Sequence, residues 1–289
     1  MKHKTNNKNN IQNGLNNDMS DIRKKFKTCL LETMDYIHSI CEEHSLCYFI
    51  MFGTLLGSAR HKGFIPWDDD IDIVMPRDDY NKFVKILTDC DSDFFIVTHE
   101  LNRKYYLPFA KVCNKKIVLY EHVSRPIKLG AYIDVFPLDY CEDSFKESLS
   151  LVRKLFIKQR QLTIKNTRID SERPLWKNAL LILLKLLLLF RTRHSLIKYI
   201  NKESTKNASK PKKYVSCLCF VVYKEKALFE SDMFSETVLV EFEGRKYRAP
   251  KHYVSILSQI YGNYLKLPPA EKRVTHHGFD LYFNDDRID

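Results

Sequence analysis

A short run of alternating acidic and apolar residues constrains this chain more than any other feature. Residues 70–74 read Asp-Ile-Asp-Ile-Val, the pattern of a buried β-strand whose two acids lie on one face. Two carboxylates held close together repel each other unless a cation lies between them. Carboxylate oxygens suit Mg²⁺ or Mn²⁺. Because Gly57 and Ser58 stand just upstream, we expect a metal-assisted site that handles phosphate groups.

The first half of the chain mixes helix and strand patterns. Apolar residues at helical spacing predict helices over residues 19–43 and 77–88. Residues 53–59 are predicted to form a turn that enters a short helix. The predicted strands span residues 46–52, 70–75, 94–98, 109–113, 117–121 and 131–137, with a hairpin at residues 114–115. These elements predict an α/β (α+β) fold with a mixed sheet at its core.

The residue pattern of the sequence changes after residue 142. Residues 144–168 predict a basic helix, residues 201–213 an exposed loop, residues 214–223 a strand, and residues 251–261 a final helix. A hairpin is expected from residues 236–242 and 245–249. We therefore divide the chain into a disordered tail (1–18), a catalytic core (19–141), a helical region (142–213) and a C-terminal part that completes the site (214–289).

Residues 175–190 form a run that is apolar almost all round and is flanked by basic residues. The run is shorter than the roughly 20 residues that span a bilayer, and Lys185 interrupts it. We expect a helix that lies in the membrane surface. A buried helix of a helical subdomain is the main alternative, and a true span is a weaker one.

Net charge and cysteine content limit the binding partners and the cellular compartment that we expect. The net charge is +11, which fits anionic partners or a lysine-rich proteome equally well. The basic residues are scattered, without the interleaved aromatics of a nucleic-acid surface, so no nucleic-acid partner is expected. The eight cysteines form no CxxC pair and predict reduced, buried thiols. We expect a cytoplasmic protein at the inner face of the cell membrane.

The stretch from Gly57-Ser58 to Asp70-Ile71-Asp72-Ile73 resembles the signature of the nucleotidyltransferase superfamily. That resemblance implies a third carboxylate from a neighbouring strand. Asp134 is the best candidate, because an acid among apolar strand residues is costly unless it is paired or bound to metal. Asp139 is a weaker candidate. Asp70, Asp72 and Asp134 are thus the expected metal ligands and catalytic residues.

Longer segments narrow this resemblance to the LicD family of phosphocholine transferases, with fukutin-related proteins as distant members. The similarity rests on residues 52–72, on Lys111 within residues 109–112, on residues 133–139 and on residues 261–277. It covers roughly residues 30–140 and 245–283, and residues 142–235 match only loosely. Family members usually have Ala or Gly where Ser58 stands, which puts the need for its hydroxyl in doubt.

The resemblance implies a donor of the CDP-choline type, an attacking glycan hydroxyl and CMP as the leaving group. The acceptor would be a surface glycan or its lipid-linked form, such as a lipopolysaccharide, teichoic acid or capsule precursor. Mg²⁺ or Mn²⁺ would offset charge on the diphosphate. The expected substrate-binding residues are Gly57, Ser58, Arg60, Lys111, Arg273, His276 and His277.

Three other readings stay open at this point. The transferred group is ribitol phosphate or glycerol phosphate in one, and a nucleotidyl group in another. In the third, the chain is an inactive basic membrane-associated protein, which the presence of all three aspartates disfavours. A choline headgroup requires aromatic side chains around it, and the sequence does not indicate which ones.

Overall fold

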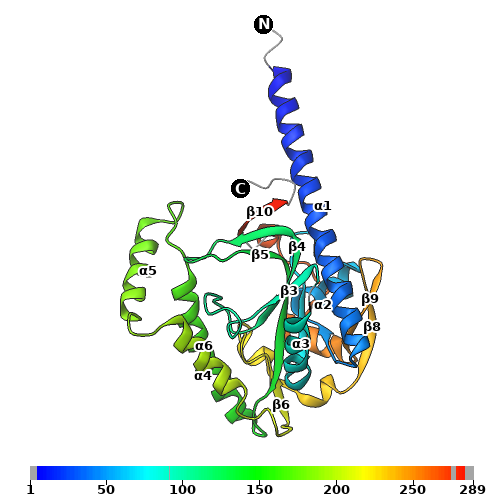
Figure 1. Ribbon diagram of the computed structural model, residues 1–289, viewed down its shortest axis with the longest axis vertical. Coiled ribbons are helices and arrows are strands. Elements are labelled where there is room, and N and C mark those ends of the chain that lie inside the picture. The colour runs from blue at the N-terminus through cyan, green and yellow to red at the C-terminus, as the bar shows by residue number, and fades with distance from the viewer. Residues whose placement is uncertain (1–4, 91, 275–277, 284–289) are drawn as a thin grey trace.

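The computed structural model describes residues 5–90, 92–274 and 278–283, which form a mixed sheet flanked by helices (Figure 1). The strands are β1 (Phe49–Ile50), β2 (Asp72–Pro76), β3 (Phe94–Val97), β4 (Ala110–Glu121), β5 (Leu129–Tyr140), β6 (Tyr214–Ser216), β7 (Phe229–Glu230), β8 (Thr237–Phe242), β9 (Arg245–Pro250) and β10 (Phe279–Phe283). The main sheet runs β1-β2-β5-β4-β10. β3 also pairs with β4, and β6 and β7 extend from β5, while β8 and β9 form a separate hairpin. The predicted mixed α/β fold is confirmed.

The centre of the sheet is buried because its strands are rich in apolar and β-branched residues. In β2, the side chains of Ile73, Val74 and Met75 have no exposed area. β2 and β5 are parallel, and Asp72 is the register partner of Asp134. β4 pairs antiparallel with the other side of β5 and places Lys111 opposite Asp134. Three polar residues therefore lie side by side across the centre of an otherwise apolar sheet.

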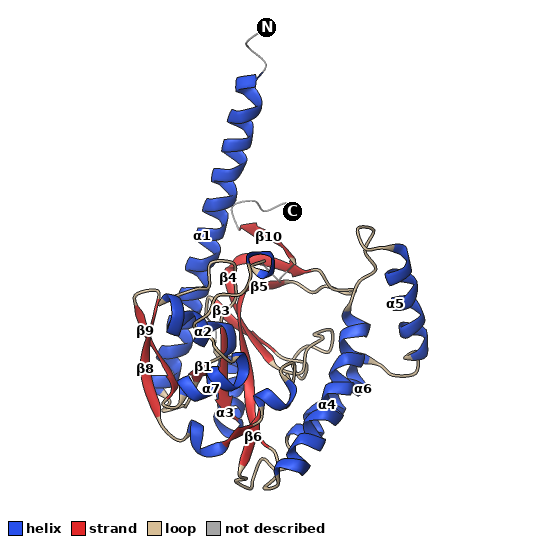
Figure 2. Ribbon diagram, turned by 180° about the vertical axis from the view of Figure 1, so that it is seen from behind, coloured by secondary structure: helices blue, strands red, loops and turns tan. Residues whose placement is uncertain are grey.

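Helices surround this sheet (Figure 2). They are α1 (Thr5–Glu43), α2 (Phe52–His61), α3 (Arg77–Asp89), α4 (Phe145–Asn166), α5 (Leu175–Leu187), α6 (Arg193–Ser204) and α7 (Tyr253–Tyr261). α1 packs on β4 and β5, α3 packs on β5 and β2, and α4 packs with α6. Figure 2 shows α4, α5 and α6 as a group that stands to one side of the sheet. No helix in the described ranges is long and apolar enough to cross a membrane.

The start of α1 differs from the prediction. A tail was expected up to residue 18, yet the backbone is helical from Thr5 onward. The later part of α1 is anchored by buried Phe26, Leu30 and Met34. Once such a segment has nucleated a helix, each further residue is added at low cost, even where the side chains are polar. The division of the chain into four parts stays a prediction.

The prediction of a hairpin within residues 109–121 is wrong. β4 is one strand from Ala110 to Glu121, and its register with β5 shifts between Asn114 and Leu119. The polar pair at residues 114–115 therefore marks an irregularity in a long strand. The partner strand β5 pairs with β4 on both sides of this shift, at residues 110–114 and at Leu119, which favours the continuous strand.

Several other boundaries also moved. Residues 53–59 lie within α2 instead of a turn, and β2 begins at Asp72 instead of residue 70. α6 occupies the start of the expected loop at residues 201–213, and β6 ends at Ser216. The β8–β9 hairpin and helices α3 and α7 lie where they were predicted.

Candidate active site

The two central strands bring Asp72 and Asp134 together. Asp72 is 9% exposed, and its backbone N–H donates a 2.8 Å hydrogen bond to the Thr54 hydroxyl of α2. Its carbonyl accepts a 3.0 Å bond from the Met51 N–H. The Asp134 N–H donates to the Ile71 carbonyl across the parallel pair at 3.1 Å. Backbone bonds on both strands thus fix the positions of the two carboxylates.

The charge on Asp72 is held in an unfavourable setting. Burial raises its pKa well above the ordinary value, and the neighbouring carboxylates of Asp70, Asp134 and Asp68 raise it further. Lys111 acts in the opposite direction. Asp70 lies two residues before the start of β2, so the prediction that it belongs to the strand is wrong. It still acts on Asp72 as part of one acidic cluster.

Lys111 is the cation inside this cluster. Its side chain is almost fully buried, and Nζ donates a 2.6 Å bond to Asp134 Oδ1. Nζ also lies 3.6 Å from Glu121 Oε1 and 3.4 Å from the centre of the Tyr132 ring. The Tyr132 hydroxyl donates to the same Glu121 oxygen at 2.5 Å. One lysine therefore links two carboxylates and an aromatic face.

Sequence reasoning missed Glu121 and Tyr132. Neither belongs to the acidic motif, and Glu121 stands at the end of a predicted strand where a solvent-facing acid is ordinary. The alternation along β4 gives one usable signal, because residues 111 and 121 are an even number apart and share a face of a regular strand. The register shift within β4 weakens that signal.

The acidic cluster opens into a cavity of about 470 Å³ between the sheet and α4. Asp70, Asp72, Asp134, Lys111 and Glu121 lie on its polar side. Its other lining residues include four phenylalanines and polar groups of α4, namely Phe109, Phe136, Phe156, Phe220, Gln159, Arg160, Thr163 and Asn166. The cavity thus combines a charged end with aromatic walls.

The acids of this cavity suit a divalent cation that shares its ligands with a substrate. In the described ranges no three His, Cys, Asp or Glu side chains converge tightly enough to hold a metal ion by themselves. Asp70 and Asp72 both line the cavity, and one oxygen of Asp134 is bonded to Lys111. Mg²⁺ is commonly held by one or two carboxylates plus substrate phosphates and water, so the residues present fit such an ion.

Comparison with known proteins identifies the family of this chain. The family model described as LicD/FKTN/FKRP, nucleotidyltransferase domain, matches residues 45–170. The chain is 30% identical over 275 residues to the lipopolysaccharide cholinephosphotransferase LicD of Haemophilus influenzae, covering 90% of this chain and 97% of that protein. The chain belongs to the LicD family. It is a phosphotransferase, so the non-enzymatic reading of the sequence is wrong.

More distant relatives match shorter segments of this LicD family member. An uncharacterized protein of Rickettsia prowazekii is 35% identical over 115 residues, 39% of this chain and 42% of that protein. The human ribitol 5-phosphate transferase FKRP is 43% identical over 44 residues, 15% of this chain and 9% of that protein. The proposed resemblance to both branches of the family is thereby confirmed.

The Gly57-Ser58 pair lies apart from the lining of the acidic cavity. Both residues are buried within α2, and the Ser58 hydroxyl donates a 2.7 Å bond to the Glu241 carbonyl of β8. A Cβ on Gly57 would lie 2.4 Å from the Gly63 carbonyl oxygen, so only glycine permits this close approach. The contacts of the pair are with its own fold, and its role in substrate binding stays a prediction.

Arg60 and Arg273 lie near each other, on the outer part of α2 and the C-terminal segment. Arg60 donates to His61 and to the Tyr264 carbonyl. Burial lowers the pKa of Arg60, and the nearby charge of Arg273 lowers it further. Arg273 packs over the Trp67 ring at 5.6 Å and donates to the Pro268 carbonyl. The predicted substrate ligands His276 and His277 lie outside the described residues.

Asp139, the weaker candidate for a third carboxylate, belongs to a different contact. It is fully buried and receives two hydrogen bonds from the Arg77 guanidinium, at 2.6 and 2.7 Å. This bidentate pair ties β5 to the start of α3. Asp134 is therefore the acid of residues 133–139 that lies in the cavity.

Proposed function

We propose that this protein transfers phosphocholine from CDP-choline to a hydroxyl group of a cell-surface glycan and releases CMP. The observation that carries the proposal is the pairing of Asp72 with Asp134 at one end of a cavity with aromatic walls. The Haemophilus influenzae relative is named as a lipopolysaccharide cholinephosphotransferase, which supports the same transferred group and a glycan acceptor.

The proposed transfer is a single displacement at the phosphorus atom that carries choline. A bond forms between that phosphorus and the acceptor oxygen, and the bond to the CMP phosphate oxygen breaks. Lys111 holds one oxygen of Asp134, and the other oxygen of this carboxylate is the proposed acceptor of the hydroxyl proton. Arg160 of α4 lines the same cavity and supplies positive charge toward the donor phosphates.

Asp70 and Asp72 are the proposed ligands of Mg²⁺ or Mn²⁺. When bound, the cation would offset negative charge on the diphosphate and on the departing CMP. The same charge would relieve the repulsion that raises the pKa of Asp72. The buried, like-charged setting of Asp72 is the feature of this chain that supports the metal.

The aromatic walls favour choline over an uncharged alditol. The Phe136 ring lies 4.4 Å from Phe109 and 4.8 Å from Phe220, centre to centre. Phe136 and Phe109 are buried, so the half-buried rings of Phe220 and Phe156 are the more accessible aromatic faces of the cavity. A quaternary ammonium group gains about 0.5–2 kcal/mol against aromatic faces, while ribitol or glycerol gains no such contact. Ribitol phosphate stays the second candidate, because the FKRP proteins are named as ribitol 5-phosphate transferases.

Helix α5 is the proposed contact with the inner face of the membrane. Trp176, Leu180, Leu183 and Leu187 follow each other at helical spacing and are all exposed. Lys185, which interrupts the apolar run, turns inward and donates a 2.6 Å bond to the Thr167 carbonyl. The outer face of α5 is thus apolar, contrary to the buried-helix alternative, and it fits an interfacial helix beside a lipid-linked acceptor.

A panel of CDP-linked donors tests the proposal. Purified protein with Mg²⁺ and a lipopolysaccharide acceptor is expected to release CMP from CDP-choline at a rate at least 10-fold above that from CDP-ribitol or CDP-glycerol. Mass spectrometry of the glycan should show the added phosphocholine. Release from CDP-ribitol or CDP-glycerol alone would contradict the choline assignment, and transfer of the CMP moiety to the acceptor would identify a nucleotidyltransferase instead.

A further inference from the structure

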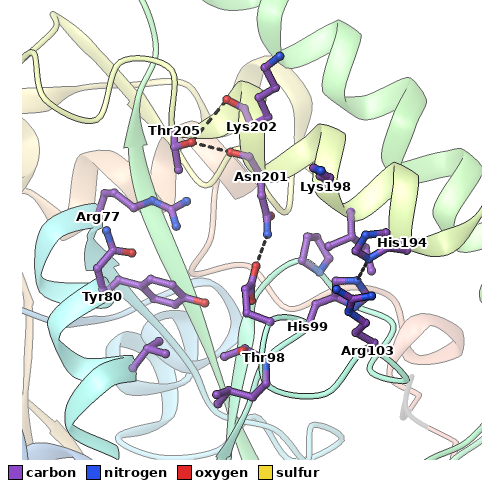
Figure 3. A pocket seen from close by; sticks show the side chains of 16 residues that line it. Arg77, Tyr80, Thr98, His99, Arg103, His194, Lys198, Asn201, Lys202 and Thr205 are labelled. Carbon is purple, nitrogen blue, oxygen red and sulfur yellow. Dashed lines mark hydrogen bonds between the residues drawn. The ribbon is translucent and has the colours of Figure 1, made fainter. Parts of the chain in front are cut away.

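A second pocket, larger than the acidic cavity, is lined in part by residues of the 98–108 loop (Figure 3). Its volume is about 720 Å³, and α3, this loop and α6 form its walls. Pro108 lines both cavities, so they adjoin. The charged and polar groups of the second pocket are different from those of the first: Arg77, Arg103, Lys198, Lys202, His99, His194, Glu100, Asn81, Thr98, Asn201 and Thr205.

The pocket carries an excess of positive charge. Arg77 is neutralised by Asp139, and Glu100 accepts a 2.8 Å bond from the Asn201 side chain, as Figure 3 shows. Arg103, Lys198 and Lys202 have no carboxylate partner within the described ranges. These three cations are among the lining residues of the pocket, and the lining contains one carboxylate, that of Glu100. Such a surface attracts an anion.

Two histidines add a polar edge of fixed orientation. A backbone carbonyl only accepts, so Nδ1 of buried His99 carries the hydrogen in its 2.7 Å bond to the Tyr105 oxygen. Nε2 of a neutral His99 then accepts from Nδ1–H of His194 at 2.8 Å (Figure 3). This chain leaves Nε2 of His194, which is exposed, available to a ligand.

The remaining lining suits a sugar. Amide and hydroxyl groups of Asn81, Thr98 and Thr205 match the hydroxyl groups of a saccharide. Helix α6, which follows α5 in the chain, contributes His194, Lys198 and Lys202 to this lining.

We propose that this pocket binds the acceptor glycan through an anionic substituent, a phosphate or carboxylate group, and presents a hydroxyl group toward the adjoining acidic cavity. The proposal rests on the transferase function proposed above and adds the charge class of the acceptor. In this proposal Arg103, Lys198 and Lys202 determine which acceptor is bound, and none of them lines the acidic cavity.

Calorimetric titration tests the pocket without the reaction. Glucose 6-phosphate and glucuronate are the probes, and glucose is the neutral comparison. We expect either anionic sugar to bind at least 10-fold more tightly than glucose, and Lys198→Glu or Arg103→Gln to remove most of that preference. Lys206→Glu, an exposed lysine just after α6, is the matched control and should bind as the wild type does. Equal binding by Lys198→Glu and wild type would overturn the proposal, as would equal binding of glucose.

CMP release separates this proposal from the proposed function. If CDP-choline is turned over equally well with anionic and neutral acceptor glycans, the pocket assignment fails and the transferase proposal stands. If no CDP-linked donor is turned over while Lys198→Glu still weakens binding of the anionic sugar, the transferase proposal fails instead. If CMP competes with glucose 6-phosphate and Lys198→Glu weakens CMP binding, the pocket belongs to the donor and the acceptor assignment is overturned.

Discussion

Asp72 and Asp134 face each other as direct register partners on the parallel strands β2 and β5, one carboxylate buried and the other held by Lys111. Parallel pairing of these strands requires the crossover that contains α3, β3 and β4. The acidic pair is therefore a product of the sheet topology and not of a local loop. It is also a place where the fold holds like charges together against their repulsion, as functional sites often do.

Removing the charge of Asp72 should abolish activity and stabilise the protein. We expect Asp72→Asn to reduce CMP release about 10²–10³-fold. In metal-free buffer at neutral pH the same change should raise the unfolding free energy by on the order of 1 kcal/mol, because it removes a buried like charge. Urea unfolding at several pH values measures the second effect. An unstable or fully active variant would contradict the assignment.

The pH dependence of that stability follows from the raised pKa of Asp72. The folded protein holds this proton to a higher pH than the unfolded chain does, so wild-type stability should fall as pH rises above the ordinary carboxyl pKa. Asp72→Asn should lose this component of the pH dependence. Added Mg²⁺ should raise the melting temperature of the wild type at neutral pH and leave that of Asp72→Asn nearly unchanged.

Lys111 should be essential to stability, unlike a similar lysine nearby. Lys111→Met leaves Asp134 and Glu121, whose side chains are each only 15% exposed, without their shared cation, which we expect to cost about 3–5 kcal/mol. Lys116→Met on the same strand removes an exposed ion pair with Glu32 and should change stability little. Denaturant unfolding of both variants checks the contrast. Equal effects would show that the buried network is not stabilised by its lysine.

Gly57 should tolerate no side chain, whatever its role toward substrate. Gly57→Ala places a Cβ against the Gly63 carbonyl and should destabilise the protein by about 1–3 kcal/mol. Gly53→Ala, on the same helix, meets only the movable Asp68 carboxylate and should stay within about 1 kcal/mol of wild type. Thermal unfolding distinguishes the two. A stable Gly57→Ala variant would contradict the close approach of α2 to residue 63.

The outer face of α5 should decide membrane binding. Replacing Leu180, Leu183 and Leu187 with serine should weaken binding to vesicles that contain anionic lipid by at least 10-fold, because each leucine transfers apolar area out of water. Serine at the exposed residues Leu239, Leu265 and Leu267 is the matched control. Vesicle flotation measures both. Unchanged flotation of the α5 variant would contradict the membrane proposal.

The sequence predicted several of the residues that the acidic cavity brings together, but not the contacts around them. Asp70 and Asp72 were found from spacing, and Asp134 from an acid placed among apolar residues. Lys111 was also selected, although its bond to Asp134 depends on a register that no local pattern specifies. The His99–His194 pair escaped detection because its two members are 95 residues apart in the chain. Glu121 lies close in sequence to Lys111 and Tyr132, but an acid at the end of a strand is ordinary, so nothing marked it out.

The main sheet is completed by β10, a strand from the C-terminal part of the chain. Its residues pair with Ile117–Glu121 of β4, the same strand that carries Lys111 and Glu121. Until β10 has left the ribosome, that stretch of β4 presents open backbone groups able to pair with another chain. In a nascent chain arrested after α7, the acidic cluster would therefore lie beside an unpaired strand edge that can aggregate. Chaperones that cover such edges would act on this protein late in its synthesis.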